Sequence, residues 1–137
     1  MRRNLLLGAL LVLCAVTLVT CDLGGSSTPT WTGAFYAIRG GTGGLISNWT
    51  FDSDGTTRGV WVTDDAISIQ VRGDYSLYQG YLWVMASGTA SNGSSTCPYN
   101  MTVDGTLEGS SGYGTYSIDF SAPWSFSSAG TWSITKK

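Results

Sequence analysis

The chain has 137 residues, of which seven are basic, nine are acidic and none is histidine. Histidine is the commonest general base and metal ligand, so its absence excludes Ser-His and Cys-His catalytic pairs and histidine-ligated metal sites, and we expect no metal and no cofactor. The basic residues are few and scattered, so nucleic-acid binding is not expected either.

The N-terminus has the composition of an export signal. Arg2 and Arg3 precede an apolar run from Leu5 to Val19. This run of about 15 residues is shorter than the roughly 20 that a membrane-spanning helix needs, which favours a cleaved signal over a permanent membrane helix. We therefore interpret residues 1–20 as a signal peptide. Its removal leaves five basic and nine acidic residues, a net charge of −4.

The signal ends in Leu18-Val19-Thr20-Cys21, which resembles the lipobox of bacterial lipoproteins except that Thr20 is bulkier than the usual residue. The resemblance implies that Cys21 carries a diacylglyceryl thioether and an acylated amino group, and more than one acyl chain holds a protein stably on a membrane. Residues 21–30 are rich in Gly, Ser and Thr and are typical of a flexible linker. We expect a protein of the bacterial cell envelope, lipid-anchored and facing the periplasm or the exterior.

From Trp31 to the C-terminus, apolar and polar residues alternate with a period of two and show no helical period. Turns rich in Gly and Asp separate the alternating stretches. The pattern predicts one domain, residues 31–137, with eight strands. The predicted strands lie at residues 31–38, 45–51, 57–63, 66–72, 80–86, about 99–107, about 116–120 and about 131–135.

Two all-β architectures suit short hairpin-linked strands, a sandwich and a barrel. A single eight-stranded antiparallel up-and-down barrel is favoured, because its last strand pairs with its first and leaves no exposed edge. The alternation also predicts which side chains point inward. The predicted inward sets are Leu45, Ser47, Trp49 and Phe51; Ile67, Ile69 and Val71; Tyr99, Met101, Val103 and Leu107; Tyr116, Ile118 and Phe120; and Trp132 with Ile134. The stretch 80–86 is nearly all apolar, so we expect both of its faces to be covered.

Four segments carry a family resemblance: Trp31-Thr32-Gly33, residues 101–107 (MTVDGTL), residues 114–117 (GTYS) and residues 130–134 (GTWSI). They resemble small bacterial lipoproteins with lipocalin-like, calycin-type barrels. The resemblance implies a fold and an envelope location, without a ligand or catalytic residues. It also implies a cysteine partner for Cys97 near the last hairpin, but residues 121–126 contain none. Cys97 is then a lone thiol, for which burial as a small apolar residue is favoured over pairing with another chain.

The predicted inward sets hold many aromatic side chains, each of which buries roughly 150–250 Å². They favour a solid core over a ligand cavity, although eight-stranded barrels form both.

Four aromatic residues are candidate binding residues. Trp124 and Phe126 lie in a loop stiffened by Pro123, where they either face solvent and contact a ligand or fold back and cap the barrel. Trp61 and Trp83 are predicted to face outward as a surface platform, with packing between adjacent strands as the alternative.

The acidic residues do not suggest catalysis. Most lie in predicted turns, and the alternation turns Asp104 and Asp119 outward, away from any apolar pocket that would raise a carboxyl pKa. The sequence predicts a non-catalytic binding module for a small apolar ligand, a glycan or a protein. The alternative is a structural or surface-coat lipoprotein with a filled core and no small ligand.

Overall fold

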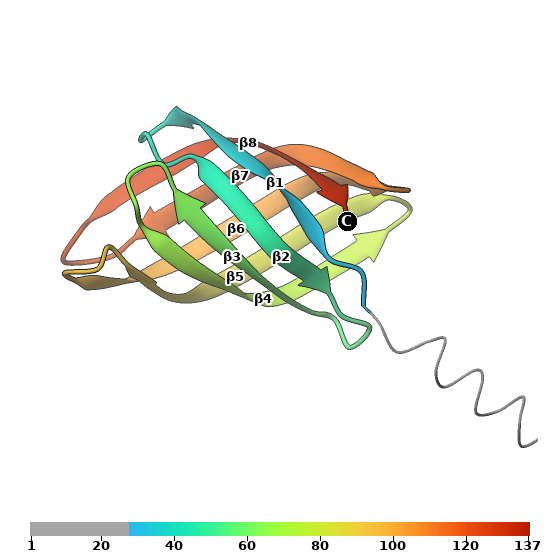
Figure 1. Cartoon of the computed structure of the whole chain (residues 1–137), viewed down its shortest axis with the longest axis horizontal. Coiled ribbons are helices and arrows are strands. Elements are labelled where there is room, and N and C mark those ends of the chain that lie inside the picture. Colours follow the sequence, from blue (N-terminus) through green and yellow to red (C-terminus); the bar gives the residue numbers. More distant parts are fainter. Residues whose placement is uncertain (1–27) are drawn as a thin grey trace, which may run out of the picture.

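The computed structural model describes residues 28–137, which form eight antiparallel strands closed into a barrel (Figure 1). The strands are β1 (Trp31–Arg39), β2 (Gly44–Phe51), β3 (Thr56–Thr63), β4 (Ser68–Tyr78), β5 (Tyr81–Ser91), β6 (Thr96–Glu108), β7 (Ser111–Phe120) and β8 (Phe126–Lys136). Each strand pairs with the next, and β1 pairs with β8 from Trp31 opposite Lys136 to Arg39 opposite Ala129. The predicted up-and-down barrel is confirmed. The predicted signal peptide, Cys21 and most of the linker lie outside the described residues.

The up-and-down strand order gives the barrel two ends, which we name the base and the rim. The base holds the start of β1, the end of β8 and the β2–β3, β4–β5 and β6–β7 turns, and the rim holds the other four turns (Figure 1). Within residues 28–137, no helix has the length and hydropathy of a membrane span.

Side chains fill the interior of the barrel. The largest that are almost wholly buried are Trp49, Trp61, Trp132, Tyr99 and Phe35. Phe35 stacks on Trp61 with ring centroids 4.5 Å apart and meets Tyr116 edge-on at 4.8 Å. Such aromatic pairs add roughly 0.5–1.5 kcal/mol each beyond the burial of their area. The described residues therefore form the solid core that the aromatic content favours.

Four of the five predicted inward sets are confirmed, those of β4, β6, β7 and β8, whose members are all buried. These strands keep a strict alternation through their predicted stretches, so each residue's face follows from that of its neighbour. Cys97 is also buried, and its thiol forms no disulfide within the described chain.

The prediction for β2 is wrong in its first half, because the strand contains a bulge. The pairing with β3 shifts register between Ser47 and Thr50, and Asn48 takes a left-handed conformation with φ of 51°. One extra residue reverses the faces. Trp49 therefore points inward, as predicted, while Leu45 is 69% exposed and Ile46 takes its place in the core.

Trp61 was predicted to face outward and instead lies wholly inside the barrel. The inward face of β3 otherwise carries Thr57, Gly59 and Thr63, and its outward face includes Val60 and Val62, so polarity gives no sign of which face is buried. Neighbouring aromatic rings decide the orientation: a Cβ on Gly59 would lie 3.0 Å from the Trp49 ring. Small inward residues on β3 leave room for these large rings.

The fifth strand also differs from its prediction. Both faces of residues 80–86 were expected to be covered, but Tyr81, Trp83 and Met85 are about half exposed, while Leu82 and Val84 are buried. The strand also continues to Ser91, beyond its predicted end at residue 86, and a short turn leads to β6 at Thr96. The apolar outward residues of β5 are therefore surface residues.

Candidate functional site

Trp124 and Phe126 cap the rim of the barrel. Both rings are partly buried against Phe120, with ring centroids 5.5 Å and 4.6 Å away, respectively. The Trp124 Nε1–H donates a 3.0 Å hydrogen bond to Ser95 Oγ across the neighbouring turn. These contacts match the capping alternative, and neither ring stands free in solvent.

Of the four aromatic candidates, Trp83 alone lies on the outer wall of the barrel and is about half exposed. Trp61 is in the core and the other two are at the rim, so the structure does not bring the four together. Trp83 lies opposite Ser76 of β4 and Asp104 of β6. The outward position of Trp83, one of the two predicted for the surface platform, is confirmed.

A groove of about 550 Å³ runs along the outer wall beside Trp83, over β4 to β7. Trp83 and Met85 supply its apolar side-chain surface. Its polar side chains are those of Asp74, Ser76, Ser87, Asn100, Thr102, Ser117 and Asp119. The groove thus joins one exposed indole to carboxylates, an amide and hydroxyls, and no lysine or arginine lines it. We name it the Trp83 groove.

Strand register places these side chains in parallel rows. Asp74, Met85, Thr102 and Ser117 are successive cross-strand partners, as are Ser87, Asn100 and Asp119. Directly opposed side chains on one face lie about 4.5–5.5 Å apart at Cβ. Residues far apart in sequence thereby form one continuous surface. The alternation predicts the outward positions of Asn100, Thr102, Ser117 and Asp119. Asp74 and Ser87 lie beyond the predicted strands, and only the pairing of four strands makes all these residues neighbours.

Hydrogen bonds fix two carboxylates close to the groove. Asp104 accepts a 3.2 Å bond from the Tyr81 hydroxyl and a 2.5 Å bond from Thr115 Oγ1. Asp119 accepts a 2.5 Å bond from Ser127 Oγ. Desolvation raises the pKa of Tyr81, and the negative charge of Asp104 raises it further. Each carboxylate has lone pairs left over from these bonds, so both can accept hydrogen bonds from hydroxyl groups of a ligand.

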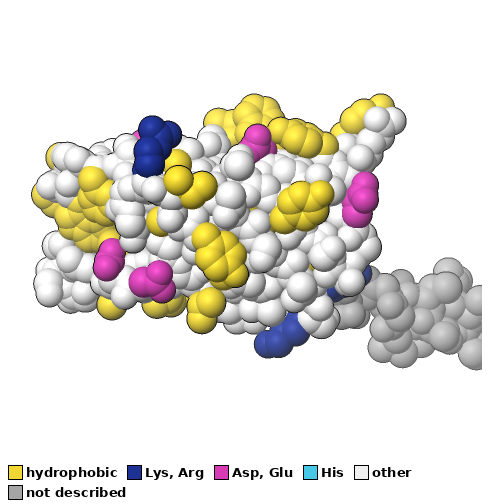
Figure 2. Space-filling view, turned by 90° about the horizontal axis from the view of Figure 1, so that it is seen from above, with side chains coloured by type: hydrophobic (Ala, Val, Ile, Leu, Met, Phe, Trp, Pro, Cys, Tyr) yellow, Lys and Arg dark blue, Asp and Glu magenta, His cyan; other side chains and the backbone are white. Residues whose placement is uncertain are grey.

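The wall of the barrel also carries apolar side chains outside the groove, including the exposed cross-strand pairs Leu45–Val62 and Tyr78–Tyr81. Figure 2 shows hydrophobic side chains spread among polar atoms on the face it presents, with a larger gathering at the end opposite the grey trace. Charged side chains are few and separate on this face. Exposed apolar side chains are common on folded proteins and by themselves indicate no binding surface.

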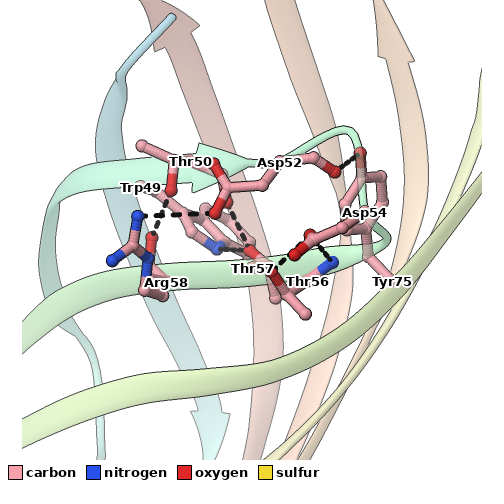
Figure 3. A network of polar contacts seen from close by, with 8 residues as sticks. All are labelled: Trp49, Thr50, Asp52, Asp54, Thr56, Thr57, Arg58 and Tyr75. Atoms are coloured by element: carbon pink, nitrogen blue, oxygen red, sulfur yellow. Dashed lines mark hydrogen bonds and ion pairs between the residues drawn. The ribbon is translucent and has the colours of Figure 1, made fainter. Parts of the chain in front are cut away.

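Two of the predicted turn aspartates accept hydrogen bonds at the β2–β3 turn, at the base of the barrel (Figure 3). Asp54 accepts hydrogen bonds from Thr56 Oγ1 at 2.6 Å and from the Thr56 amide at 3.0 Å, which lower the pKa of its carboxyl. The main-chain oxygen of Asp52 accepts a 2.6 Å bond from the Tyr75 hydroxyl. Among the described residues, no three acidic or cysteine side chains gather as a metal site would require.

Comparison of the chain with protein-family models, curated proteins and solved structures found no match.

Proposed function

We propose that this barrel is a non-catalytic glycan-binding module, and that Trp83 is its main contact. One observation carries the proposal: a half-exposed indole lies in a groove lined with hydrogen-bonding side chains on the outer wall, while the interior is filled. Ligand sites typically combine an apolar surface with a few polar groups that fix orientation. The Trp83 groove has both.

The chemistry of the groove suits sugar rings. A sugar presents C–H groups on its ring faces, which pack on the negative face of an aromatic ring. Its hydroxyl groups both donate and accept, so they match the carboxylates of Asp74 and Asp119 and the amide of Asn100. A purely apolar ligand would leave these polar groups without partners, which costs binding energy.

The filled core supports this choice among the predicted ligands. A lipocalin-type barrel holds a small apolar ligand inside, but here Trp49, Trp61 and Trp132 occupy the interior. The same core suits the alternative function, a structural or surface-coat lipoprotein without a small ligand. The exposed position of Trp83 in a polar groove favours the glycan-binding module.

For location, we propose that residues 1–20 are a signal peptide and that acyl chains on Cys21 anchor the protein to an envelope membrane. The support is the sequence pattern before Cys21 and its resemblance to lipoproteins with lipocalin-like barrels. The described chain enters the barrel at the base, whereas the Trp83 groove lies on the side wall. A tether to the base would leave that wall open to glycans.

The test is affinity electrophoresis of the full-length chain in detergent, using gels that contain neutral soluble glucans, mannans or galactans. We expect at least one polymer to retard the wild type, and Trp83→Ala to weaken binding about tenfold or more, as loss of an aromatic hot spot does. Trp124→Ala, at the rim, and Tyr36→Ala, an exposed aromatic on β1, are the matched controls.

If the polymer still retards both control variants but retards Trp83→Ala much less than the wild type, the result supports the groove as the site. If no polymer, neutral or acidic, retards the wild type, or if Trp83→Ala migrates as the wild type does, the glycan-binding module is rejected. The structural or surface-coat function would then be preferred.

A further inference from the structure

A second, smaller groove of about 240 Å³ lies on the outer wall over β2, β3 and β4. Its lining differs from that of the Trp83 groove because it is basic. The outward side chains along it are those of Asn48, Thr50, Arg58, Val60, Gln70 and Arg72. We name it the arginine groove.

Arg58 and Arg72 are direct cross-strand partners on the outer face of β3 and β4. Like charges in directly opposed positions destabilise a sheet. Among the described residues there are only five basic side chains, so the placement of two of them face to face is notable. An anion between two guanidinium groups would remove this repulsion.

Both guanidinium groups retain free hydrogen-bond donors. Arg58 meets Asp52 through a single contact of 3.5 Å, and its side chain is 65% exposed. Arg72 is exposed and makes no ion pair with any described residue. Each guanidinium carries five N–H donors in a planar fork that matches the oxygens of a carboxylate or a phosphate. Thr50 and Asn48 add a hydroxyl and an amide beside this pair.

The two grooves adjoin along β4. Residues 70–72 line the arginine groove and residues 73–76 line the Trp83 groove. The charge changes at this boundary, from Arg72 to Asp74 two residues further on the same face. At about 3.4 Å per residue, Arg72 lies roughly 14 Å along the strand from Ser76, the partner of Trp83. A short oligosaccharide spans such a distance.

We propose that Arg58 and Arg72 bind an anionic group of a glycan whose other sugar units occupy the Trp83 groove. This inference rests on the proposed function and names its ligand class, an acidic glycan bearing carboxylate or phosphate groups. Trp83 provides stacking for any suitable sugar ring, and the arginine groove selects the charged polymer.

The experiment compares each acidic polymer with its own neutral form, using the full-length chain in detergent. Polygalacturonate, alginate and hyaluronan are paired with their carboxyl-reduced forms, and phosphomannan is paired with its dephosphorylated form. We expect about tenfold or more tighter binding to the acidic member of at least one pair, and a loss of that preference at high salt. The pair that shows the preference identifies carboxylate or phosphate as the bound group.

The variants Arg58→Gln and Arg72→Gln, separately and together, test which residues carry the preference. We expect the double variant to bind the acidic and neutral members alike, while its affinity for the neutral member stays at the wild-type value. Arg39→Gln makes the same charge change at the rim end of β1, outside both grooves, and should keep the preference. Equal effects of Arg39→Gln and Arg72→Gln would overturn the inference, because they would show only a general charge effect.

The two proposals fail in different ways. If the wild type binds acidic and neutral members equally and Trp83→Ala abolishes both, the arginine groove is overturned and the glycan-binding function stands. If no polymer of either kind binds, both are overturned. A preference for acidic polymers that Arg58→Gln and Arg72→Gln leave unchanged also rejects the arginine groove.

Discussion

The Tyr99 hydroxyl donates a 2.6 Å hydrogen bond to the main-chain oxygen of Gln70. Tyr99 belongs to β6 and Gln70 to β4, so the phenol reaches across the intervening strand β5. It does so beside Gly88, its cross-strand partner, where a Cβ would lie 3.4 Å from the Tyr99 ring. The backbone pairing of β4 with β5 is interrupted here, because no residues pair between the Ile69–Ala90 pair and the Gly73–Ala86 pair. The phenol therefore satisfies a carbonyl at a gap in the sheet.

Removal of this hydroxyl should destabilise the barrel. We expect Tyr99→Phe to lower the free energy of unfolding by about 1–3 kcal/mol, because it leaves a carbonyl at the gap without its partner. Urea denaturation followed by tryptophan fluorescence measures the change. Tyr113→Phe is the control, since Tyr113 is 63% exposed and should shift stability by no more than about 0.5 kcal/mol. Equal effects of the two variants would show that the bond to Gln70 contributes nothing.

Stability should fall at alkaline pH. Burial raises the pKa of Tyr99 and of Tyr116 above the ordinary value of 10.0. Above that pH the phenols of the unfolded chain lose protons while the folded ones keep them, so the unfolded state binds fewer protons and the free energy of unfolding decreases. The contribution is complete below pH 10 and is lost as pH rises through the folded-state pKa values.

Urea denaturation at a series of pH values from about 8 to about 11.5 measures this loss of stability. The double variant Tyr99→Phe/Tyr116→Phe removes both groups, so its stability should depend less steeply on pH than that of the wild type. Parallel curves for the two proteins would mean that these phenols do not control the alkaline transition.

Two buried tryptophans should respond differently to the same substitution. The Trp49 Nε1–H donates a 2.8 Å bond to Thr57 Oγ1, which itself donates to the Thr50 main-chain oxygen at 2.7 Å (Figure 3). The Trp61 Nε1–H finds no hydrogen-bond partner among the described residues. Both changes to Phe remove similar volume from the core, but Trp49→Phe also breaks a hydrogen bond.

We therefore expect Trp49→Phe to cost about 1 kcal/mol more than Trp61→Phe in the free energy of unfolding. Thermal and urea denaturation of both variants under the same conditions measure the difference. A larger loss for Trp61→Phe would indicate that packing against Phe35, rather than hydrogen bonding, dominates the difference.

Lipid attachment predicts a specific labelling pattern in a bacterial host. Cells fed a fatty-acid analogue should label the wild-type chain, and Cys21→Ala should remove the label and release the protein from the membrane fraction, because the acyl chains provide the anchor. Cys14→Ala, within the predicted signal peptide, should be labelled normally. Persistent labelling and membrane retention of Cys21→Ala would exclude Cys21 as the lipid site.

Local pattern determined most of the fold. On β4, β6, β7 and β8, alternation of large apolar and polar residues predicts the inward faces correctly, because successive side chains of a strand point to opposite sides. On β5 the same rule places Trp83 and Met85 on one face. Because both faces of this strand are apolar, the sequence does not show which of them is exposed to solvent. Exposure of that face follows from the position of β5 in the barrel, with nothing packed outside it.

Tertiary structure decided what alternation leaves open. The bulge at Asn48 exchanges the faces of Leu45 and Ile46, and Asn is among the few residue types that tolerate its left-handed conformation. Trp61 turns inward because Gly59 and two threonines leave space that large rings fill. The sequence of β3 alone does not show how large the side chains are that other strands pack against it.

The candidate grooves show the same division. The sequence alone determined that Trp83, Arg58 and Arg72 occupy strands, and it gave no indication that they share one wall. Register across β3, β4 and β5 places them on adjoining surfaces, and register depends on backbone hydrogen bonds between segments far apart in the chain. Strand formation is encoded locally, whereas the surface that the strands present together depends on their pairing.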